Sequence, residues 1–497
     1  MTNWKKYILA AVIVAAAVFA FNRNLYRSVP SDFRDAPRDT FAVDSLKNST
    51  PPGGAGETSI PEAPNAPQAY AGENDSPVVP PNNASEEDGI SPKWYGADSN
   101  RARMKFTTYV LSNNYSGESI EEILTEKITS QIVDLQLKHM FGAFKTQPDF
   151  KNNPGIPSGT YKVKLLGAER VSGTPYIKIR YSYDDLVVFS KNLFRGGNQS
   201  LSFVLPKDPL RIYKKGHISG TNRNHCTDKH HNHHSDFWYF WDPYQEGCPI
   251  TDTDLVTVQA ELQPISSTLN TYPEYRQLRD GNLMQVTFLI GVNENFNYND
   301  AGTNNFRDAF VSLQKAGFKA ILDKPRHKML SLRNAKYTTH LNIYLVKSDT
   351  VEFAQLAVNG LENSDIFLYN GHSGLGSYLD PKKLAEAVGK ETLSLPTRKY
   401  QILYFNGCST YAYYNVPFFE LKRTPDDPNG TKKLDIITTG IASMFLTGAE
   451  VDVSFLTSIA TDQRPSWQTI INRIHKAEGD YSALTHVNGD EDNPTTP

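Results

Sequence analysis

The stretch Ser364–Gly376, SDIFLYNGHSGLG, places a run of apolar residues directly before a histidine that glycines flank. A second stretch, Tyr400–Thr410 with the sequence YQILYFNGCST, carries Asn-Gly-Cys where the first carries Asn-Gly-His. Near-continuous apolarity is typical of strands that are buried on both faces of a parallel sheet. We therefore expect two such strands, each followed by a tight glycine turn that presents one reactive side chain, His372 or Cys408.

Similar strand candidates alternate with helical segments over much of the carboxyl-terminal half. They are Met284–Ile290, Leu341–Val346, Asp365–Tyr369, Gln401–Phe405 and Leu434–Thr438. This alternation predicts βαβ units, so we expect an α/β fold over residues 271–487, with a mainly parallel sheet flanked by helices. Sites in such sheets form beyond the carboxyl ends of the strands, which is where His372 and Cys408 would lie.

A cysteine and a histidine at one sheet edge suit nucleophilic catalysis, because an imidazole can lower the pKa of a thiol or take its proton. Flanking glycines leave backbone N–H groups to face an oxyanion, and the candidates for this role are Ser373, Gly374 and Cys408. Taken singly, Cys408 fits a small core residue and His372 a turn residue. Their pairing on successive strands favours a catalytic site.

These two stretches resemble the paired signature of caspase-like cysteine peptidases, the group of caspases, gingipains, clostripain, legumains, separases and CHAT domains. The resemblance covers roughly residues 283–475. It implies a caspase-like fold with Cys408 as nucleophile and His372 as the catalytic histidine, and it places Thr439 and Gly440 near the primary specificity pocket. The family usually has glycine directly after the histidine, whereas this chain has Ser373 before Gly374.

Residues 101–270 are expected to form a β-rich accessory domain. A helical stretch at residues 120–144 is followed by short segments rich in Val, Ile, Tyr and Thr, which turn signals separate. These strand candidates are Tyr161–Leu166, Tyr176–Tyr183, Leu186–Phe189 and Leu201–Leu205, with Asp184-Asp185 interpreted as a turn.

Histidines, cysteines and aromatic residues concentrate between residues 225 and 248. The polar members are His225, Cys226, His230, His231, His233, His234 and Cys248, and the aromatic run is Phe237–Trp241. A Cys226–Cys248 disulfide would contribute about 3 kcal/mol and leave Cys408 as the single free thiol. The alternative is a zinc, copper or nickel site made by the five histidines, although no spacing matches a standard metal motif. We expect the disulfide, no cofactor, and an aromatic run that serves as strand core rather than as a ligand platform.

The amino end has the layout of an export segment. Lys5 and Lys6 precede an apolar run at residues 7–21, so residues 1–22 are predicted to be a signal peptide or a membrane anchor; a buried core helix is the alternative. Residues 23–100 are predicted to be a disordered, proline-rich linker, and residues 488–497 a disordered tail. The expected location is the periplasm or cell envelope, with the inner membrane as the site of any anchor.

The net charge of −3 is too balanced for the electrostatic field that nucleic-acid binding needs. The expected partners are a protein or peptide substrate and, through the amino-terminal segment, a membrane. The sequence thus predicts an exported caspase-like cysteine endopeptidase with a Cys408–His372 dyad. The alternative is a catalytically inactive caspase-fold envelope protein that acts as a binding or scaffold module.

Overall fold

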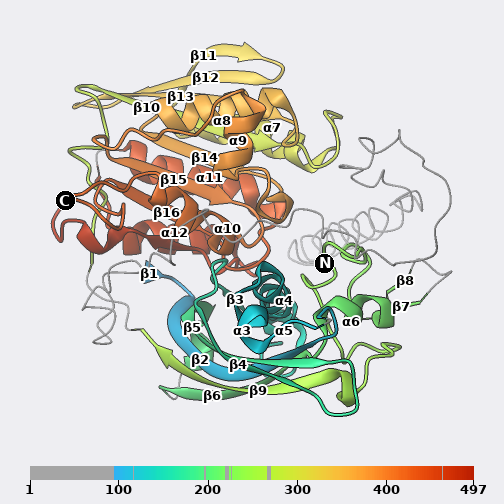
Figure 1. Ribbon diagram of the computed structural model, residues 1–497. Helices are drawn as coiled ribbons and strands as arrows, with labels where there is room; N and C mark the ends of the chain where they lie inside the picture. The colour runs from blue at the N-terminus through green and yellow to red at the C-terminus, as the bar shows by residue number, and fades with distance from the viewer. Residues whose placement is uncertain are drawn as a thin grey trace, which may run out of the picture. The chain divides into compact units, whose positions relative to one another are not determined.

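The computed structural model describes residues 95–115, 117–194, 197–218, 223–224, 226–265, 270–461 and 463–497. All of them fall within one compact unit, Ala63–Pro497, and form a mixed α/β structure with two main sheets (Figure 1). We call residues 95–96 and 270–497 the α/β region and residues 99–265 the antiparallel region. The predicted export segment, residues 1–22, lies outside the described residues. Among those described, no helix is both long and apolar enough to cross a membrane.

The α/β region contains a nine-stranded sheet. From one edge to the other, its strands are β1 (Tyr95–Gly96), β17 (His486–Asn488), β16 (Leu434–Thr438), β15 (Gln401–Asn406), β14 (Ile366–Asn370), β10 (Leu283–Gly291), β13 (Thr338–Val346), β12 (His327–Arg333) and β11 (Lys319–Lys324). The strands from β16 to β13 are parallel, and those outside them run antiparallel to their neighbours. The sheet is therefore mixed rather than mainly parallel, because antiparallel strands complete both edges.

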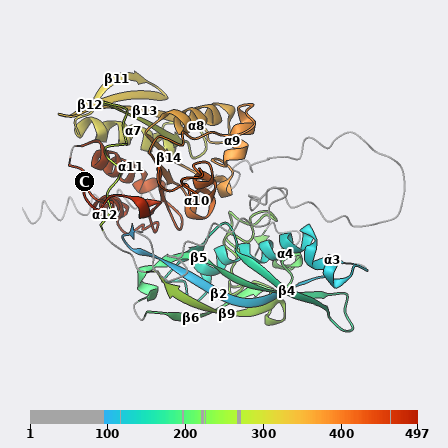
Figure 2. The same ribbon diagram turned by 60° about the vertical axis from the view of Figure 1, so that its left-hand side comes forward.

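Helices cover both faces of this sheet (Figure 2). They are α7 (Ala301–Lys315), α8 (Val351–Asn363), α9 (Pro381–Ala387), α10 (Thr410–Glu420), α11 (Phe445–Ala460) and α12 (Trp467–Glu478), with the 3-10 helices η4 (Gly374–Gly376) and η5 (Asp490–Asp492). One core joins α7, α11 and α12 to the sheet, and a second joins α8, α9 and α10. Successive strand residues face opposite sides, so Leu368 packs in the first core and Phe367 in the second. Burial on both faces explains why the central strands are apolar at nearly every position.

The antiparallel region contains a six-stranded sheet that curls around short helices (Figure 1). In sheet order its strands are β3 (Gly155–Pro157), β5 (Ile177–Ser190), β2 (Ser99–Ser112), β9 (Leu255–Pro264) and β6 (Gln199–Pro206), with β4 (Val163–Arg170) also paired to β5. The other elements are α3 (Ile120–Thr125), α4 (Lys127–Lys138), α5 (Met140–Thr146), α6 (Pro209–Gly216), β7 (His217–Ile218), β8 (Arg223–Asn224), η2 (Lys191–Phe194) and η3 (Asp252–Asp254). Helices α3, α4 and α5 bury their apolar side chains against the sheet.

Two local predictions for this region are wrong. Asp184-Asp185 is not a turn but lies within the continuous strand β5. Asp184 forms an ion pair of 2.6 Å with Arg103 of β2, and Asp185 accepts a hydrogen bond of 2.7 Å from the Ser158 hydroxyl. Because neighbours pair both carboxylates, the strand continues through them. The helical stretch at residues 120–144 is divided, since Glu126 has extended backbone that ends α3 and precedes α4.

The ordered chain also extends beyond the predicted boundaries at both ends. Residues 488–497, expected to be disordered, include the buried residues Asp490 and Asn493. Asp490 accepts a hydrogen bond of 2.6 Å from the Thr271 hydroxyl, and Asn493 donates to the Asp435 carboxylate. At the other end, β1 and the start of β2 lie within residues 95–100, which the sequence assigns to the linker. Strand pairing at the first segment and side-chain hydrogen bonds at the second join both to distant residues, which composition does not reveal.

Candidate active site

The turns that follow β14 and β15 lie in contact at the carboxyl edge of the sheet. The two strands are paired in parallel so that Asn370 is opposite Asn406, and each asparagine is followed by a glycine and then by His372 or Cys408. The Gly371 N–H donates to the Asn406 carbonyl at 3.1 Å. A Cβ on Gly407 would lie only 2.7 Å from the Gly371 carbonyl oxygen, so this position has no room for a side chain. The structure thus brings the two predicted turns together.

A buried carboxylate, that of Asp452, is hydrogen-bonded to the last residue of both strands. Asp452 of α11 is fully buried and accepts hydrogen bonds from the side-chain amides of both Asn370 and Asn406, the latter at 2.8 Å. Burial raises the pKa of Asp452 to about 7, against the opposing effect of the two amide donors. The same helix therefore holds both asparagines, and with them the start of both turns.

His372 is exposed and is held from two sides. Its Nε2 lies 2.9 Å from Oδ1 of Asn293, which follows the carboxyl end of β10. An amide oxygen only accepts, so in this contact Nε2 carries the proton and Nδ1 is the basic nitrogen of the ring. The ring packs edge-on against Phe445, with 5.2 Å between centroids, and the Tyr369 hydroxyl donates to the His372 carbonyl.

Cys408 is half-buried at the start of α10. Its Sγ lies 4.0 Å from the Ser443 carbonyl oxygen, in the segment that leads from β16 into α11. Burial raises the pKa of the Cys408 thiol, while a hydrogen bond from the Ser443 backbone and the charge of Lys145 lower it in part. The next residue, Ser409, has a φ of 57° in the left-handed region, which non-glycine residues adopt at a cost of about 1–3 kcal/mol. Such strain is concentrated at functional sites.

Residues of the antiparallel region line one side of this site. The Tyr239 hydroxyl lies 2.8 Å from the Ser409 hydroxyl, next to Cys408. The Lys145 ammonium of α5 lies over the Tyr239 ring, 3.7 Å from its centroid. Phe141 of the same helix stacks on Tyr413 of α10 with 5.9 Å between centroids. The site therefore includes residues from both regions, which the sequence did not indicate.

The other predicted site residues support the turns from within. Ser373 is buried, and its carbonyl accepts a hydrogen bond of 3.1 Å from the Tyr414 hydroxyl, while Gly374 has a left-handed φ of 56°. Thr439 is fully buried; its hydroxyl donates to the Gly407 carbonyl, and its N–H donates to the Thr410 hydroxyl at 2.9 Å. A Cβ on Gly440 would lie 3.0 Å from that of Leu484. Thr439 thus braces the Cys408 turn, and Gly440 packs closely against Leu484.

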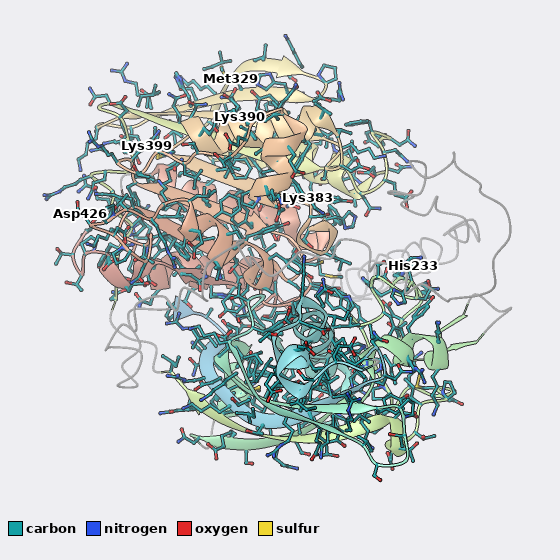
Figure 3. The ribbon with its side chains drawn as sticks, in the orientation of Figure 1. His233, Met329, Lys383, Lys390, Lys399 and Asp426 are labelled. Carbon is teal, nitrogen blue, oxygen red and sulfur yellow. A yellow bond between two sulfur atoms is a disulfide. The ribbon has the colours of Figure 1, made fainter. Side chains whose placement is uncertain are left out.

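Cys226 and Cys248 form a disulfide with their Cα atoms 4.8 Å apart, and Cys408 is free. Of the alternative metal ligands, His225 lies outside the described residues. His230 and His233 are exposed, and the side chain of His233 lies at the surface (Figure 3). His231 bonds to Asp228 at 2.9 Å, and His234 packs edge-on against Tyr213. Within the described part of the chain, no group of three His, Cys, Asp or Glu side chains could hold a metal ion.

The aromatic run Phe237–Trp241 forms successive turns, not the expected strand. Phe237 and Trp241 pack in a small core around the Cys226 end of the disulfide, whereas Trp238 and Tyr239 pack in the core shared with α8, α9 and α10. The consecutive residues Trp238 and Tyr239 share one core, whereas a strand would point them to opposite faces, so the backbone has to turn here. The run therefore connects the disulfide loop to Tyr239, which lines the site.

Sequence reasoning missed Asn293, Asp452, Tyr239 and Lys145. The repeated Asn-Gly of the two turns is a signal for Asp452, because two asparagines at buried strand ends need a shared hydrogen-bond partner. Asn293 follows a predicted strand of the same sheet and could have been found by the rule that found His372. Lys145 lies in another region, and nothing in its local sequence distinguishes it from a solvent-facing helical lysine.

Comparison with known proteins finds no match, whether with protein-family models, with curated proteins or with solved structures. The class that fold and site define is therefore a broad one. It is a mixed α/β protein in which a histidine and a cysteine follow adjacent parallel strands. Any narrower function has to be argued from these residues themselves.

Proposed function

We propose that this protein is a cysteine peptidase that uses Cys408 and His372 as its dyad, on a caspase-like form of the α/β fold. The observation that carries the proposal is the contact between the turns after β14 and β15, through Gly371 and Gly407. Reactive groups of open α/β sheets gather at this edge, and a thiol beside an imidazole is a common pair for acyl transfer.

In the proposed reaction, the Cys408 thiolate attacks the carbonyl carbon of a peptide bond. A bond forms between Sγ and that carbon, and the carbonyl π electrons move to the oxygen. The backbone N–H groups of Ser373, Gly374 and Cys408 are the candidates to stabilise this oxyanion. His372 donates a proton to the leaving amine as the C–N bond breaks, and water then hydrolyses the thioester.

Exposed apolar side chains near the two residues that contact His372, Asn293 and Phe445, support a polypeptide substrate. Phe296 and Tyr298 follow Asn293, with 42% and 74% of their surface exposed. Met444 and Leu446 lie on either side of Phe445 in sequence and are 43% and 75% exposed. Several large apolar side chains at a surface are typical of a binding region, and we propose that these contact the chain on both sides of the cleaved bond.

We further propose that the protein acts outside the cytoplasm, in the periplasm or cell envelope, with residues 1–22 as its signal or membrane anchor. The Cys226–Cys248 disulfide supports this location, because such bonds persist in oxidising compartments.

A second function, a non-catalytic binding or scaffold protein with the same fold, is favoured by one observation. The Cys408 thiol has a raised pKa, and the His372 ring is engaged by Asn293. A thiol of this kind reacts slowly, as a buried structural cysteine does. The two functions predict opposite results when native protein meets a cysteine-directed probe at neutral pH.

The test uses the full chain with Cys408→Ala and His372→Ala, and with His340→Ala in β13 as the control for loss of a histidine. We expect the wild type and the control to cleave members of a broad peptide library, and both dyad variants to lose cleavage by at least about 100-fold. His372 is exposed, so its loss should leave the midpoint of thermal unfolding nearly unchanged.

The double variant should be barely worse than either single one, because the two residues act in one step. A wild type that cleaves nothing and whose Cys408 labels only after unfolding would overturn the peptidase proposal and leave the scaffold function. Cleavage that survives in Cys408→Ala would instead place the activity elsewhere, or in a contaminant.

A further inference from the structure

Lys145 is a buried cation without a conventional partner. Its Nζ is inaccessible to solvent and makes no hydrogen bond within the described part of the chain. It lies over the rings of Tyr239 and Phe240, at 3.7 and 4.7 Å from their centroids. Burial lowers the pKa of Lys145 to about 7, and the negative charges of Cys408 and Asp228 oppose this shift. Aromatic faces offset only part of the cost of burying an ammonium, so this position requires a further explanation.

Lys138, in the preceding helix, has the acidic partner that usually offsets the cost of burying an ammonium group. Lys138 of α4 also lies over an aromatic ring, 5.9 Å from the centroid of Trp238, and burial lowers its pKa to about 8. Asp134, one helical turn earlier, provides the opposing charge for Lys138. Helix α5 has no acidic residue that could do the same for Lys145.

Among the residues that the structure describes, Asp228 is the only carboxylate whose charge acts on Lys145, and it is already hydrogen-bonded. Its Oδ1 accepts a hydrogen bond from the backbone N–H of His231, at 2.8 Å, and pairs with the ring Nδ1 of the same residue, at 2.9 Å. The other group that acts on Lys145 is the Cys408 sulfur, and its effect on Lys145 is larger than that of Asp228.

The contact between α5 and α10 fixes Lys145 relative to Cys408. The Lys145 ammonium lies over the ring of Tyr239, and the hydroxyl of Tyr239 lies 2.8 Å from the hydroxyl of Ser409. Phe141 stacks on Tyr413 one turn into α10. The titratable groups around the Cys408 sulfur are thus Lys145 and Tyr239 from the antiparallel region, and Tyr369 and Tyr413 from the α/β region, with His372 on the adjoining turn.

We propose that Lys145 is a positioning residue for Cys408: its ammonium, supplied by the antiparallel region, is the counter-charge that stabilises the Cys408 thiolate. This inference rests on the proposed function, because it gives the nucleophile its charge partner. The thiol proton passes to His372 in the peptidase reaction or to buffer in a labelling reaction. No bond to Lys145 forms, and the pair gains stability only when sulfur is negative and nitrogen positive.

The test measures the rate at which iodoacetamide alkylates Cys408 in the full, disulfide-bonded chain between pH 6 and pH 10. Lys145→Met keeps an unbranched side chain on the Tyr239 ring and removes the charge, and Lys145→Arg keeps the charge. Lys145 is mostly protonated only below its pKa of about 7, so we expect Lys145→Met to slow alkylation by about 10-fold at pH 6 and to leave the rate above pH 9 nearly unchanged. Lys145→Arg should restore most of the rate.

Lys138→Met is the matched control, because it removes a lysine of the preceding helix that has no role at Cys408. It should leave the profile of alkylation where it is in the wild type, whereas a general loosening of the antiparallel region would change both methionine variants alike. Thermal unfolding of each variant checks that the chain is folded during labelling. An unchanged pH profile in folded Lys145→Met overturns the inference, and so does a Cys408 that stays unreactive across the whole range.

Cleavage measured in the same samples separates this inference from the proposed function. If the wild type cleaves peptides and Lys145→Met has an unchanged pH profile, the inference fails and the peptidase stands. If the profile changes as expected but no protein cleaves the library, the charge pair stands and the peptidase proposal fails. A changed profile accompanied by a matching loss of cleavage supports both.

Discussion

Replacing Asp452 by asparagine should change the stability of the fold in a way that depends on pH. Burial raises the pKa of Asp452 from 3.8 to about 7. Between these values the folded protein holds one more proton at this site than the unfolded chain, so the wild type loses stability as the pH rises. In Asp452→Asn, the side-chain amide mimics the protonated acid and does not titrate.

The magnitude follows from the two pKa values. Each pH unit between them is equivalent to about 1.4 kcal/mol, and partial ionisation near pH 7 reduces the total slightly. From pH 5 to pH 7, we therefore expect the free energy of unfolding of Asp452→Asn to rise by about 2 kcal/mol relative to the wild type. Well below pH 4 the difference between the two proteins should be constant.

Urea unfolding at pH 4, 5, 6 and 7, with identical ionic strength, measures this difference directly. Glu450→Gln, at an exposed position of the same helix, accounts for the general effect of removing one carboxylate from α11. A difference between Asp452→Asn and the wild type that does not vary with pH would refute the reasoning. It would mean that the amides of Asn370 and Asn406 hold the carboxylate ionised in spite of burial.

Two further predictions concern other parts of the molecule. Burial lowers the pKa of His486 from 6.5 to about 4, so the folded state binds fewer protons than the unfolded chain between these values, and stability falls as the pH drops. His486→Gln should therefore gain about 2 kcal/mol relative to the wild type between pH 7 and pH 4.5 in urea unfolding, and a constant difference would contradict the lowered pKa. Protein extracted from the cell envelope should yield the peptides of Cys226 and Cys248 linked when mapped without reductant, and the Cys226→Ala, Cys248→Ala pair should lose about 3 kcal/mol of stability. Free thiols at both positions would contradict the disulfide and the proposed location together.

The sequence predicts those parts of the site that depend on neighbours in the chain. Apolar runs end at Asn370 and Asn406, and the glycine that follows each one allows the turn, so the positions of His372 and Cys408 can be predicted locally. That the two strands are adjacent follows from the βαβ rule. Both turns lie where these rules put them.

The parts that the sequence does not predict depend on pairing between distant residues. Asp184 lies within β5, where it pairs with β2 and forms an ion pair with Arg103, a residue far away in sequence. The short strand β17, which lies between β1 and β16, has three residues, too few to produce a periodic pattern. Lys145 is buried because α5 docks against α10, and its own helix gives no sign of this. Each of these positions is set by tertiary contacts that local propensity does not encode.

The contact between the two regions decides how Cys408 can behave. A Cβ on Gly159 would lie 1.7 Å from the Ala412 carbonyl oxygen, so the antiparallel region packs backbone to backbone against the first turn of α10. That packing buries the Cys408 thiol, and burial raises the pKa of the thiol. The same packing brings in the Lys145 ammonium, which lowers the pKa in part. Moving the antiparallel region away would expose the sulfur and remove Lys145 at the same time. Access and charge at Cys408 are therefore coupled, and the reactivity of this thiol is a property of both regions rather than of the α/β sheet that carries it.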